Sequence, residues 1–506
     1  MRLTPEDDIL GIKWRLTRGA TWIAATRILV NIIAFANTLL LARLLTPADF
    51  GLVAIAIAIT TVITSVTELS LASALIQHKD PGDEHFDSAW TLNFARGAIL
   101  ALLICGIAVP TAQLYGDTRL VPVMLVIGAV TLLGGMANPK LVVFSRKLVF
   151  WQEFALGVSQ KLLGFIVAAV VALLYRSYWA LIAGIVATQV SATVLSYFLF
   201  PYRPRLRLAC VGELLSFSAW LSLGQAINTL NWKFDQLVIG YFLGSASLGY
   251  YTVGDNLAVL PTREATAPLA QTLFPAFSRL ADDPARLRRA YQHAQALLCM
   301  VALPLGCGFA IVARPLIMLT MGETWLPAVI VVQLLAGIFA IQTLSSTLQP
   351  LALATGKTRS LFYRDSVNFV IRVPLIVVGM VTGGLVGIVC ARCISGLVGT
   401  AINMAMTRWL LGLSFRDQLA VNVRSLIGVG LMALGVFLVG QMISDFDSSL
   451  GRIAKIAVMV AVGAIIYVGT LYTLWYRAGR PDGPESEATR AMGRMLSSGS
   501  ARRMLI

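Results

Sequence analysis

The chain has 506 residues, of which 57% are hydrophobic and 13% are charged. Soluble domains are usually about 25% charged, so this composition excludes an ordinary soluble enzyme. It equally excludes a disordered or nucleic-acid-coating protein, although the formal net charge is +15. Apolar runs long enough to cross a bilayer recur from end to end, and each predicts a membrane-spanning helix.

The apolar runs predict about fourteen transmembrane helices, with ends placed to within about four residues. In chain order they are 19–43, 51–76, 88–109, 120–144, 151–174, 179–201, 212–240, 247–276, 290–314, 325–353, 361–382, 384–408, 422–444 and 453–476. The short loops between them leave no room for a soluble catalytic domain. The sequence therefore predicts an all-α integral membrane protein that is not an enzyme.

Basic residues are concentrated on every second loop. These loops and the tail carry Lys13, Arg15 and Arg18, then Lys140, Arg146 and Lys147, then Arg203, Arg205 and Arg207, then Arg279, Arg286, Arg288 and Arg289, then Lys357 and Arg359, then Arg408 and Arg416, then Arg477, Arg480, Arg490, Arg494, Arg502 and Arg503. The alternate loops hold Arg43, Arg119, Arg176 and Arg452. Because cytoplasmic loops are enriched in lysine and arginine, both termini of this multi-pass protein are predicted to be cytoplasmic. This asymmetry explains the net charge without a nucleic-acid partner.

Two pairs of similar segments within the chain indicate a duplicated unit. Residues 46–51 align with 244–249 at a spacing of about 198 residues, and Asn138-Pro139 aligns with Gln349-Pro350. Six helices per copy is an even number, so the pseudo-symmetry axis should follow the membrane normal. The predicted organisation is a cytoplasmic N-terminal segment (1–18), a six-helix bundle (19–202), a cytoplasmic linker (203–211), a second six-helix bundle (212–411), two additional transmembrane helices (412–476) and a basic cytoplasmic tail (477–506) that we expect to be disordered.

Four short motifs resemble bacterial polysaccharide exporters: LLTPADFG at 44–51, FDSAWT at 86–91, SYWAL at 177–181 and PYRP at 201–204. The resemblance is to the polysaccharide-transport branch of the multidrug/oligosaccharidyl-lipid/polysaccharide exporter superfamily, the Wzx-type flippases. It runs through most of the first 280 residues and is limited to topology beyond about residue 400. The resemblance implies two six-helix lobes around a central cavity. It also implies translocation of undecaprenyl-diphosphate-linked oligosaccharides across the bacterial inner (plasma) membrane by alternating access, for exopolysaccharide or lipopolysaccharide assembly.

Cations outnumber anions within the predicted spans. Charged side chains in a membrane are costly and by default mark a pathway, and guanidinium groups pair well with phosphate oxygens. The sequence therefore predicts a diphosphate-binding cavity formed by Arg27, Arg96, Lys161, Arg263 and Arg372. Structural ion pairs are the alternative: Arg27 with Glu68, Arg263 with Glu264, and Arg372 with Asp365.

Acidic residues in the spans are the candidates for energy coupling. Without a Walker-type phosphate-binding loop the chain is not expected to hydrolyse ATP, so an ion gradient, the substrate gradient or downstream polymerisation must supply the energy. The candidates for binding H⁺ or Na⁺ are Glu68, Asp235, Asp255 and Glu264. No cofactor or metal is expected, because the pair Cys390 and Cys393 lies within a span with no histidine nearby.

Three other functions remain open on the sequence. A cation-coupled multidrug exporter would need a cavity dominated by acids and aromatic residues, and a membrane-bound glycosyl- or acyltransferase would need a sizeable loop outside the membrane. A lipid II flippase would use the same diphosphate carrier. The expected partners are the lipid-linked oligosaccharide and membrane lipids, with a polysaccharide polymerase and a chain-length regulator as further candidates.

Overall fold

The structure is a computed structural model that describes residues 5–67, 71, 75, 81–146, 151–211, 219–443, 448–481, 483–487 and 489–490. The described residues form helices and irregular segments and contain no β-strand. Among them, ten helices are long and apolar enough to cross a membrane. This confirms the predicted all-α, multi-pass membrane fold. The chain divides into two compact units, Met1–Val253 and Gly254–Ile506.

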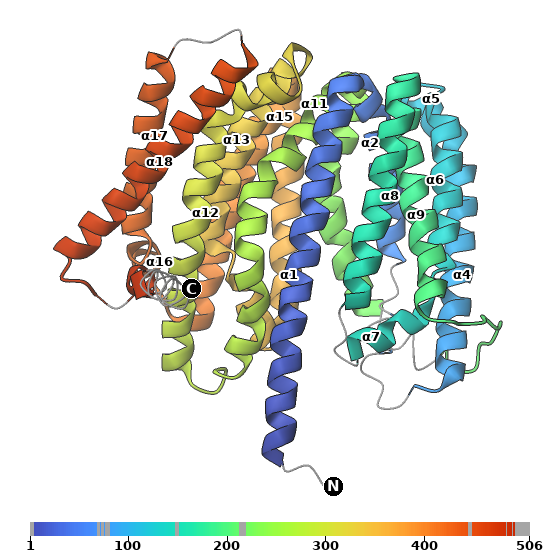
Figure 1. The fold of residues 1–506 in the computed structure, drawn as a ribbon, viewed down its shortest axis with the longest axis horizontal. Coiled ribbons are helices and arrows are strands. Elements are labelled where there is room, and N and C mark those ends of the chain that lie inside the picture. Colours follow the sequence, from blue (N-terminus) through green and yellow to red (C-terminus); the bar gives the residue numbers. More distant parts are fainter. Residues whose placement is uncertain are drawn as a thin grey trace, which may run out of the picture. The chain divides into compact units, whose positions relative to one another are not determined.

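The first unit holds the helices coloured blue to green in Figure 1. They are α1 (Pro5–Leu44), α2 (Pro47–Val66), α4 (Asp83–Gly106), α5 (Ala108–Tyr115), α6 (Leu120–Gly135), η1 (Pro139–Leu141), α7 (Val142–Arg146), α8 (Trp151–Tyr175), α9 (Trp179–Leu199) and the beginning of α11 (Ala219–Ser278). Helix α8 packs on both α1 and α9, and α6 packs on α4, α9 and α2. The α1–α8–α9 core is built around small side chains such as Ala168, Ala172 and Ala180, which let helices approach closely.

The second unit holds the rest of α11 and the helices coloured from yellow-green to red in Figure 1. They are α12 (Pro284–Thr320), η2 (Glu323–Trp325), α13 (Leu326–Gln342), η3 (Thr343–Ser345), α14 (Leu348–Ala354), α15 (Thr358–Leu411), α16 (Phe415–Ala420), α17 (Val423–Met442) and α18 (Ser449–Arg477). Helix α12 packs on α13, α17 and α18, and α13 packs on α15.

The 60-residue element α11 is a helical hairpin rather than one long helix. Gly244 has φ +79°, a left-handed conformation that favours glycine. Asp235 and Tyr251 are 16 residues apart, yet Tyr251 Oη lies 2.5 Å from Asp235 Oδ2. A straight helix would separate them by roughly 24 Å, so the chain must turn back at Gly244. This matches the predicted helices 212–240 and 247–276 where the structure describes them.

The 54-residue element α15 turns in the same way at Gly383 and Gly384, whose backbones are not helical. A Cβ atom at Gly379 would lie 2.3 Å from the carbonyl oxygen of Gly387, and one at Gly387 would lie 1.9 Å from that of Gly379. The two arms of α15 therefore touch backbone to backbone, as expected for the predicted pair 361–382 and 384–408.

Two predicted helices are interrupted in the structure. The helix expected over 120–144 ends at Gly135, because Asn138 begins a separate 3₁₀ turn at Pro139 and its Oδ1 accepts from Lys140 N at 2.9 Å. The helix expected over 325–353 becomes 3₁₀ at Thr343–Ser345 before α14 begins. The second predicted helix, 51–76, is described as α2 to Val66, and most of its remainder lies outside the described residues.

The two segments aligned at a spacing of 198 residues lie against each other. A Cβ atom at Gly51 would lie 1.6 Å from the carbonyl oxygen of Ser245, and a Cβ atom at Gly249 would lie 1.8 Å from that of Pro47. Adding 198 to 47 and 51 gives 245 and 249, so the two contacts are equivalent under the repeat. The sequence similarity between 46–51 and 244–249 thus corresponds to a reciprocal packing contact between the α1–α2 and α11 hairpins. The predicted division into six-helix bundles with a linker at 203–211 stays a prediction.

Candidate functional site

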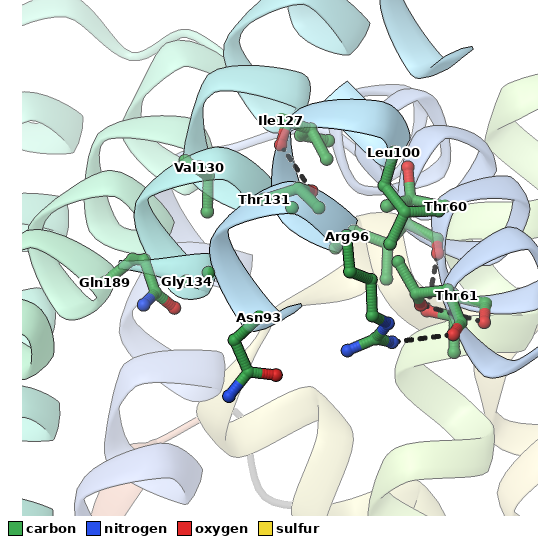
Figure 2. A pocket seen from close by; sticks show the side chains of 14 residues that line it. Thr60, Thr61, Asn93, Arg96, Leu100, Ile127, Val130, Thr131, Gly134 and Gln189 are labelled. Atoms are coloured by element: carbon green, nitrogen blue, oxygen red, sulfur yellow. Dashed lines mark hydrogen bonds between the residues drawn. The ribbon is translucent and has the colours of Figure 1, made fainter. Parts of the chain in front are cut away.

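A polar cavity of about 410 Å³ lies among four helices of the first unit. Its polar lining consists of Thr60, Thr61 and Thr64 from α2, Asn93 and Arg96 from α4, Thr131 from α6 and Gln189 from α9. Figure 2 shows Gln189 across the cavity from the α2 threonines, with Asn93 and Arg96 between them. A cavity with this volume is at the small end of ligand-binding pockets.

Helical spacing explains why these side chains meet. The lining residues of α2 are at 57, 60, 61 and 64, those of α4 at 93, 96, 97 and 100, and those of α6 include 127, 130, 131 and 134. Each set follows the i, i+3, i+4, i+7 pattern that places residues on one face of a helix. Helices α2, α4 and α6 therefore each direct one face, made of polar and apolar residues, toward the cavity.

Glycines bring two of these helices close together. A Cβ atom at Gly97 would lie 3.1 Å from Gly135 Cα, and a Cβ atom at Gly135 would lie 2.6 Å from the carbonyl oxygen of Asn93. The close approach of α4 and α6 places the backbone of Asn93 beside Gly135. A side chain at Gly135 would force the two helices apart.

Most threonine hydroxyls of the lining bond to their own helices. Thr61 Oγ1 donates to Ile57 O at 2.6 Å, Thr64 Oγ1 to Thr61 O at 3.1 Å and Thr131 Oγ1 to Ile127 O at 2.9 Å. Thr60 differs: the residue is 9% exposed, and its Oγ1 has no hydrogen-bond partner within the described residues. A buried polar atom without a partner needs an explanation.

Arg96 links the cavity to the end of α2. Its Nε donates to Thr67 Oγ1 at 3.2 Å and its Nη2 donates to Thr64 O at 2.9 Å. Carbonyl groups in the last turn of a helix lack intrahelical partners, and a cation there is favourable. Arg96 therefore holds the C-terminal turn of α2 while it lines the cavity (Figure 2).

The other predicted cations lie outside this cavity. In the first unit Arg27 is half-buried on α1 and Lys161 is exposed on α8, and neither contributes to the lining. In the second unit Arg372 is half-buried on α15, and Arg263 Nε lies 2.9 Å from Glu264 Oε1 with its side chain 53% exposed. Of the five predicted cations, the cavity contains Arg96. The combination of all five in one diphosphate site is a proposal.

The predicted acids have defined surroundings, except for Glu68, which lies outside the described residues. Asp235 is fully buried and accepts the hydrogen bond from Tyr251. Asp255 Oδ1 lies 3.0 Å from Arg392 Nη2 in a buried ion pair. Glu264 pairs with Arg263, as the structural alternative expected. Asp365 pairs with its neighbour Arg364 at 2.7 Å.

Sequence reasoning found part of this site. Arg96 was predicted from its charge within an apolar span. Asn93, Thr131 and Gln189 gave a weaker signal, because each is a single neutral polar residue in an apolar run. Within the described ranges, no group of three His, Cys, Asp or Glu side chains is arranged to hold a metal ion.

Comparisons with known proteins agree with this architecture. The chain is 23% identical over 415 residues to the lipopolysaccharide biosynthesis protein WzxC of Escherichia coli, covering 81% of this chain and 84% of that protein. It is 24% identical to the teichuronic acid biosynthesis protein TuaB of Bacillus subtilis, covering 90% and 94%. It is 25% identical to the succinoglycan biosynthesis transport protein ExoT of Rhizobium meliloti, covering 89% and 92%.

Solved structures share the fold. The lipid II flippase MurJ in an inward closed conformation superposes with a TM-score of 0.67 at 14% identity, covering 90% of this chain and all of that one. An inward-facing multidrug resistance MATE transporter superposes with a TM-score of 0.53 at 14% identity, covering 76% and 96%. The model of the polysaccharide biosynthesis protein family matches residues 40–330, which is more than half of the chain. The chain therefore belongs to the polysaccharide biosynthesis protein family.

Proposed function

We propose that this protein is a flippase that carries undecaprenyl-diphosphate-linked oligosaccharide repeat units across the inner membrane for exopolysaccharide or lipopolysaccharide assembly. The observation that carries the proposal is the similarity, over at least four fifths of each chain, to three proteins named for polysaccharide biosynthesis or its transport step. Family membership supports the same conclusion.

The architecture supports transport rather than catalysis. The described chain is almost entirely apolar helices and short connections, and its fold is shared with transporters. Alternating access between two helical bundles is the mode of action that we assign to it. A membrane-bound glycosyl- or acyltransferase would need a polar catalytic constellation, and the described residues of the cavity present hydroxyls, amides and one guanidinium.

The cavity lining supports a neutral or anionic substrate. Its described side chains include Arg96 and no carboxylate. A site for cationic drugs would need acids to balance the ligand charge, so this lining disfavours the multidrug exporter. Arg27, Arg96, Lys161, Arg263 and Arg372 remain the proposed diphosphate-binding residues, and Arg96 is the one of them that lines this cavity.

We assign fourteen transmembrane helices with both termini in the cytoplasm. Ten apolar helices, the second arm of α15, the two arms of α11 and the shorter apolar helix α6 make up this number. The alternating loop charge supports the orientation. Two six-helix bundles (19–202 and 212–411), joined by the linker 203–211 and followed by two helices (412–476), remain the proposed organisation.

Coupling to H⁺ or Na⁺ through a buried acid is proposed, with Asp235 and Asp255 as the most deeply placed described candidates. Energy from the downstream consumption of substrate is the alternative. A polysaccharide polymerase and a chain-length regulator are the proposed protein partners.

Deletion of the gene tests the proposed function. The deletion strain should lose surface polysaccharide and accumulate the lipid-linked repeat unit in the inner leaflet, because synthesis continues while translocation stops. The intact gene supplied in trans should reverse both effects. Unchanged polysaccharide with arrested peptidoglycan synthesis would instead indicate a lipid II flippase, and increased sensitivity to cationic drugs alone would indicate a multidrug exporter.

A further inference from the structure

The short helix α16, which connects α15 to α17 (Figure 1), has its polar side inward and its apolar side outward. Gln418 is 4% exposed, and its Nε2 donates to Met404 O at 2.9 Å and to Leu413 O at 3.1 Å. Phe415 and Leu419, one helical turn apart, are 38% and 40% exposed. A helix at a water-facing surface has the opposite arrangement. The outer side of α16 is therefore suited to hydrocarbon rather than to water.

The exposed apolar side of α16 continues into α17. Val423, Ile427 and Leu431 follow Leu419 at intervals of four residues, and all three are exposed. Helix α17 is long and apolar enough to cross a membrane, so its exposed apolar side chains face lipid chains. Helix α16 therefore lies where the chain passes into the bilayer, on the side that the loop charge assigns to the cytoplasm.

Positive charge is concentrated at this boundary. The stretches 356–359 and 408–420, which the structure describes in full, contain the exposed cations Lys357, Arg359, Arg408 and Arg416. The carboxylate within these stretches is Asp417, which accepts hydrogen bonds from Ser414 N at 3.0 Å and Ser414 Oγ at 2.7 Å. Because Asp417 caps α16, the surface keeps a strong positive excess.

Two of these cations lie over exposed aromatic rings. Lys357 Nζ lies 5.8 Å from the centre of the Trp409 ring, and Arg408 Cζ lies 5.9 Å from the centre of the Phe415 ring. Helix α15 turns back on itself, so the loop before it and helix α16 after it meet at the same end. Tryptophan is enriched at membrane–water interfaces. The aromatic rings therefore place these cations at the level of lipid head groups.

We propose that the four cations, together with Trp409 and Phe415, form a binding site for an anionic phospholipid of the cytoplasmic leaflet. Ammonium and guanidinium groups bind phosphate oxygens, and the exposed apolar side of α16 and α17 accommodates the acyl chains. A zwitterionic lipid is disfavoured, because its own cationic group is repelled by the basic cluster. The site lies in the second unit, away from the polar cavity of the first, and the proposal does not depend on the flippase function.

Quenching of Trp409 fluorescence by brominated lipids tests this site. The protein is placed in phosphatidylcholine bilayers that contain a small fraction of brominated phosphatidylglycerol or of brominated phosphatidylcholine. The signal of Trp409 is the difference between each protein and its Trp409→Phe counterpart. In the wild type, phosphatidylglycerol should be enriched roughly fivefold beside Trp409 relative to phosphatidylcholine, and high salt should weaken this enrichment.

Two double variants separate the site from general surface charge. Lys357→Gln/Arg408→Gln removes the two cations that lie over aromatic rings and should reduce the enrichment to about twofold or less. Arg286→Gln/Arg289→Gln is the matched control, because it removes the same charge from α12 and should leave the enrichment unchanged. In that helix Arg286 pairs with Asp283 at 3.3 Å, and Arg289 Nε donates to the carbonyl of Ala285 at 3.4 Å.

Three results would overturn the proposal. The first is equal quenching by both brominated lipids in the wild type. The second is the same enrichment in the two double variants, whether it is retained or lost. The third is displacement of phosphatidylglycerol by a small mole fraction of undecaprenyl diphosphate, which would assign these cations to the substrate path instead.

Discussion

Asp255 and Arg392 show how a charge can be kept inside the membrane fold of the second unit. Their side chains are 17% and 4% exposed and approach to 3.0 Å, and the Arg392 guanidinium also lies over the Phe339 ring at 5.5 Å. Removing one partner of a buried ion pair leaves the other charge poorly compensated. Asp255 therefore has a structural role whether or not it also takes part in coupling.

Asp255→Asn should lower the free energy of unfolding by about 3 kcal/mol, measured as a fall in the apparent melting temperature in detergent. Glu264→Gln on the same element is the control, since it breaks a pair whose Arg263 partner is 53% exposed and should cost less than about 1 kcal/mol. The double variant Asp255→Leu/Arg392→Met should recover most of the loss. Equal effects of Asp255→Asn and Glu264→Gln would show that the buried pair is not stabilising.

Asp117 and Arg119 form a paired turn between α5 and α6. Arg119 Nε lies 3.0 Å from Asp117 Oδ1 and Nη2 lies 2.8 Å from Oδ2. The hydrogen bond from Arg119 lowers the pKa of the Asp117 carboxyl below its usual value. A carboxyl whose pKa is lower in the folded state stabilises the protein above its unfolded pKa, and this stabilisation is lost as the pH falls.

Asp117→Asn should therefore lower the melting temperature slightly and by a constant amount above about pH 5, where the unfolded aspartate is also ionised. The difference from the wild type should shrink through about pH 4 and disappear at lower pH, once the folded carboxyl is protonated. Arg119→Gln should show the same pH window, because it removes the other half of the pair. A difference that grows as the pH falls would contradict this account.

At the scale of elements, the contact between the two repeated segments depends on glycine. Gly51 meets the carbonyl of Ser245 and Gly249 meets the carbonyl of Pro47, with no space for a side chain at either position. The α1–α2 connection is held by a capping box, in which Thr46 N donates to Asp49 Oδ2 and Asp49 N donates to Thr46 Oγ1. A precise turn thus presents Gly51 to its partner hairpin.

Gly51→Ala and Gly249→Ala should each destabilise the protein by about 1–3 kcal/mol through overpacking, read from the melting temperature and from surface polysaccharide yield. The double variant should cost little more than either single one, since both substitutions separate the same pair of hairpins. Gly106→Ala is the control, because a Cβ atom there meets nothing within 4 Å. Strict additivity of the two single effects would contradict a shared contact.

Two of the motifs that carried the family resemblance hold one segment in place. The segment 201–211 runs along α4: Tyr202 Oη donates to Asp87 Oδ1 at 2.6 Å, Arg207 N donates to Thr91 Oγ1 at 3.0 Å and Cys210 N donates to Ser88 Oγ at 3.3 Å. Burial, followed by the hydrogen bond to Asp87, raises the pKa of Tyr202. FDSAWT and PYRP are thus a docking pair in this structure, a pairing that neither motif reveals alone.

At the scale of the whole molecule, apolar run length was enough to predict the all-helical membrane fold, but not all helix bounds: α1 begins at Pro5 rather than at residue 19, and α12 spans Pro284–Thr320 rather than 290–314. It was not enough to predict the breaks at Asn138 and Thr343, because backbone and side-chain contacts from other helices stabilise them: Asn138 Nδ2 donates to Phe200 O at 2.7 Å and Gln295 Nε2 donates to Thr343 O at 2.9 Å. Charge alone also could not separate a lining residue from a structural one. Arg96 and Arg263 gave the same signal, yet one lines a cavity and the other forms an exposed pair.

Translocation by the purified protein is the most direct test of the central claim. The protein is placed in liposomes with undecaprenyl-diphosphate-linked oligosaccharide on the inner leaflet, and arrival of the sugar at the outer leaflet is followed by its oxidation with membrane-impermeant periodate. The oxidised fraction should rise well above that of protein-free liposomes, and boiled protein should give no rise. A rate equal to that of empty liposomes, with the protein folded and correctly inserted, would contradict the assignment as a flippase.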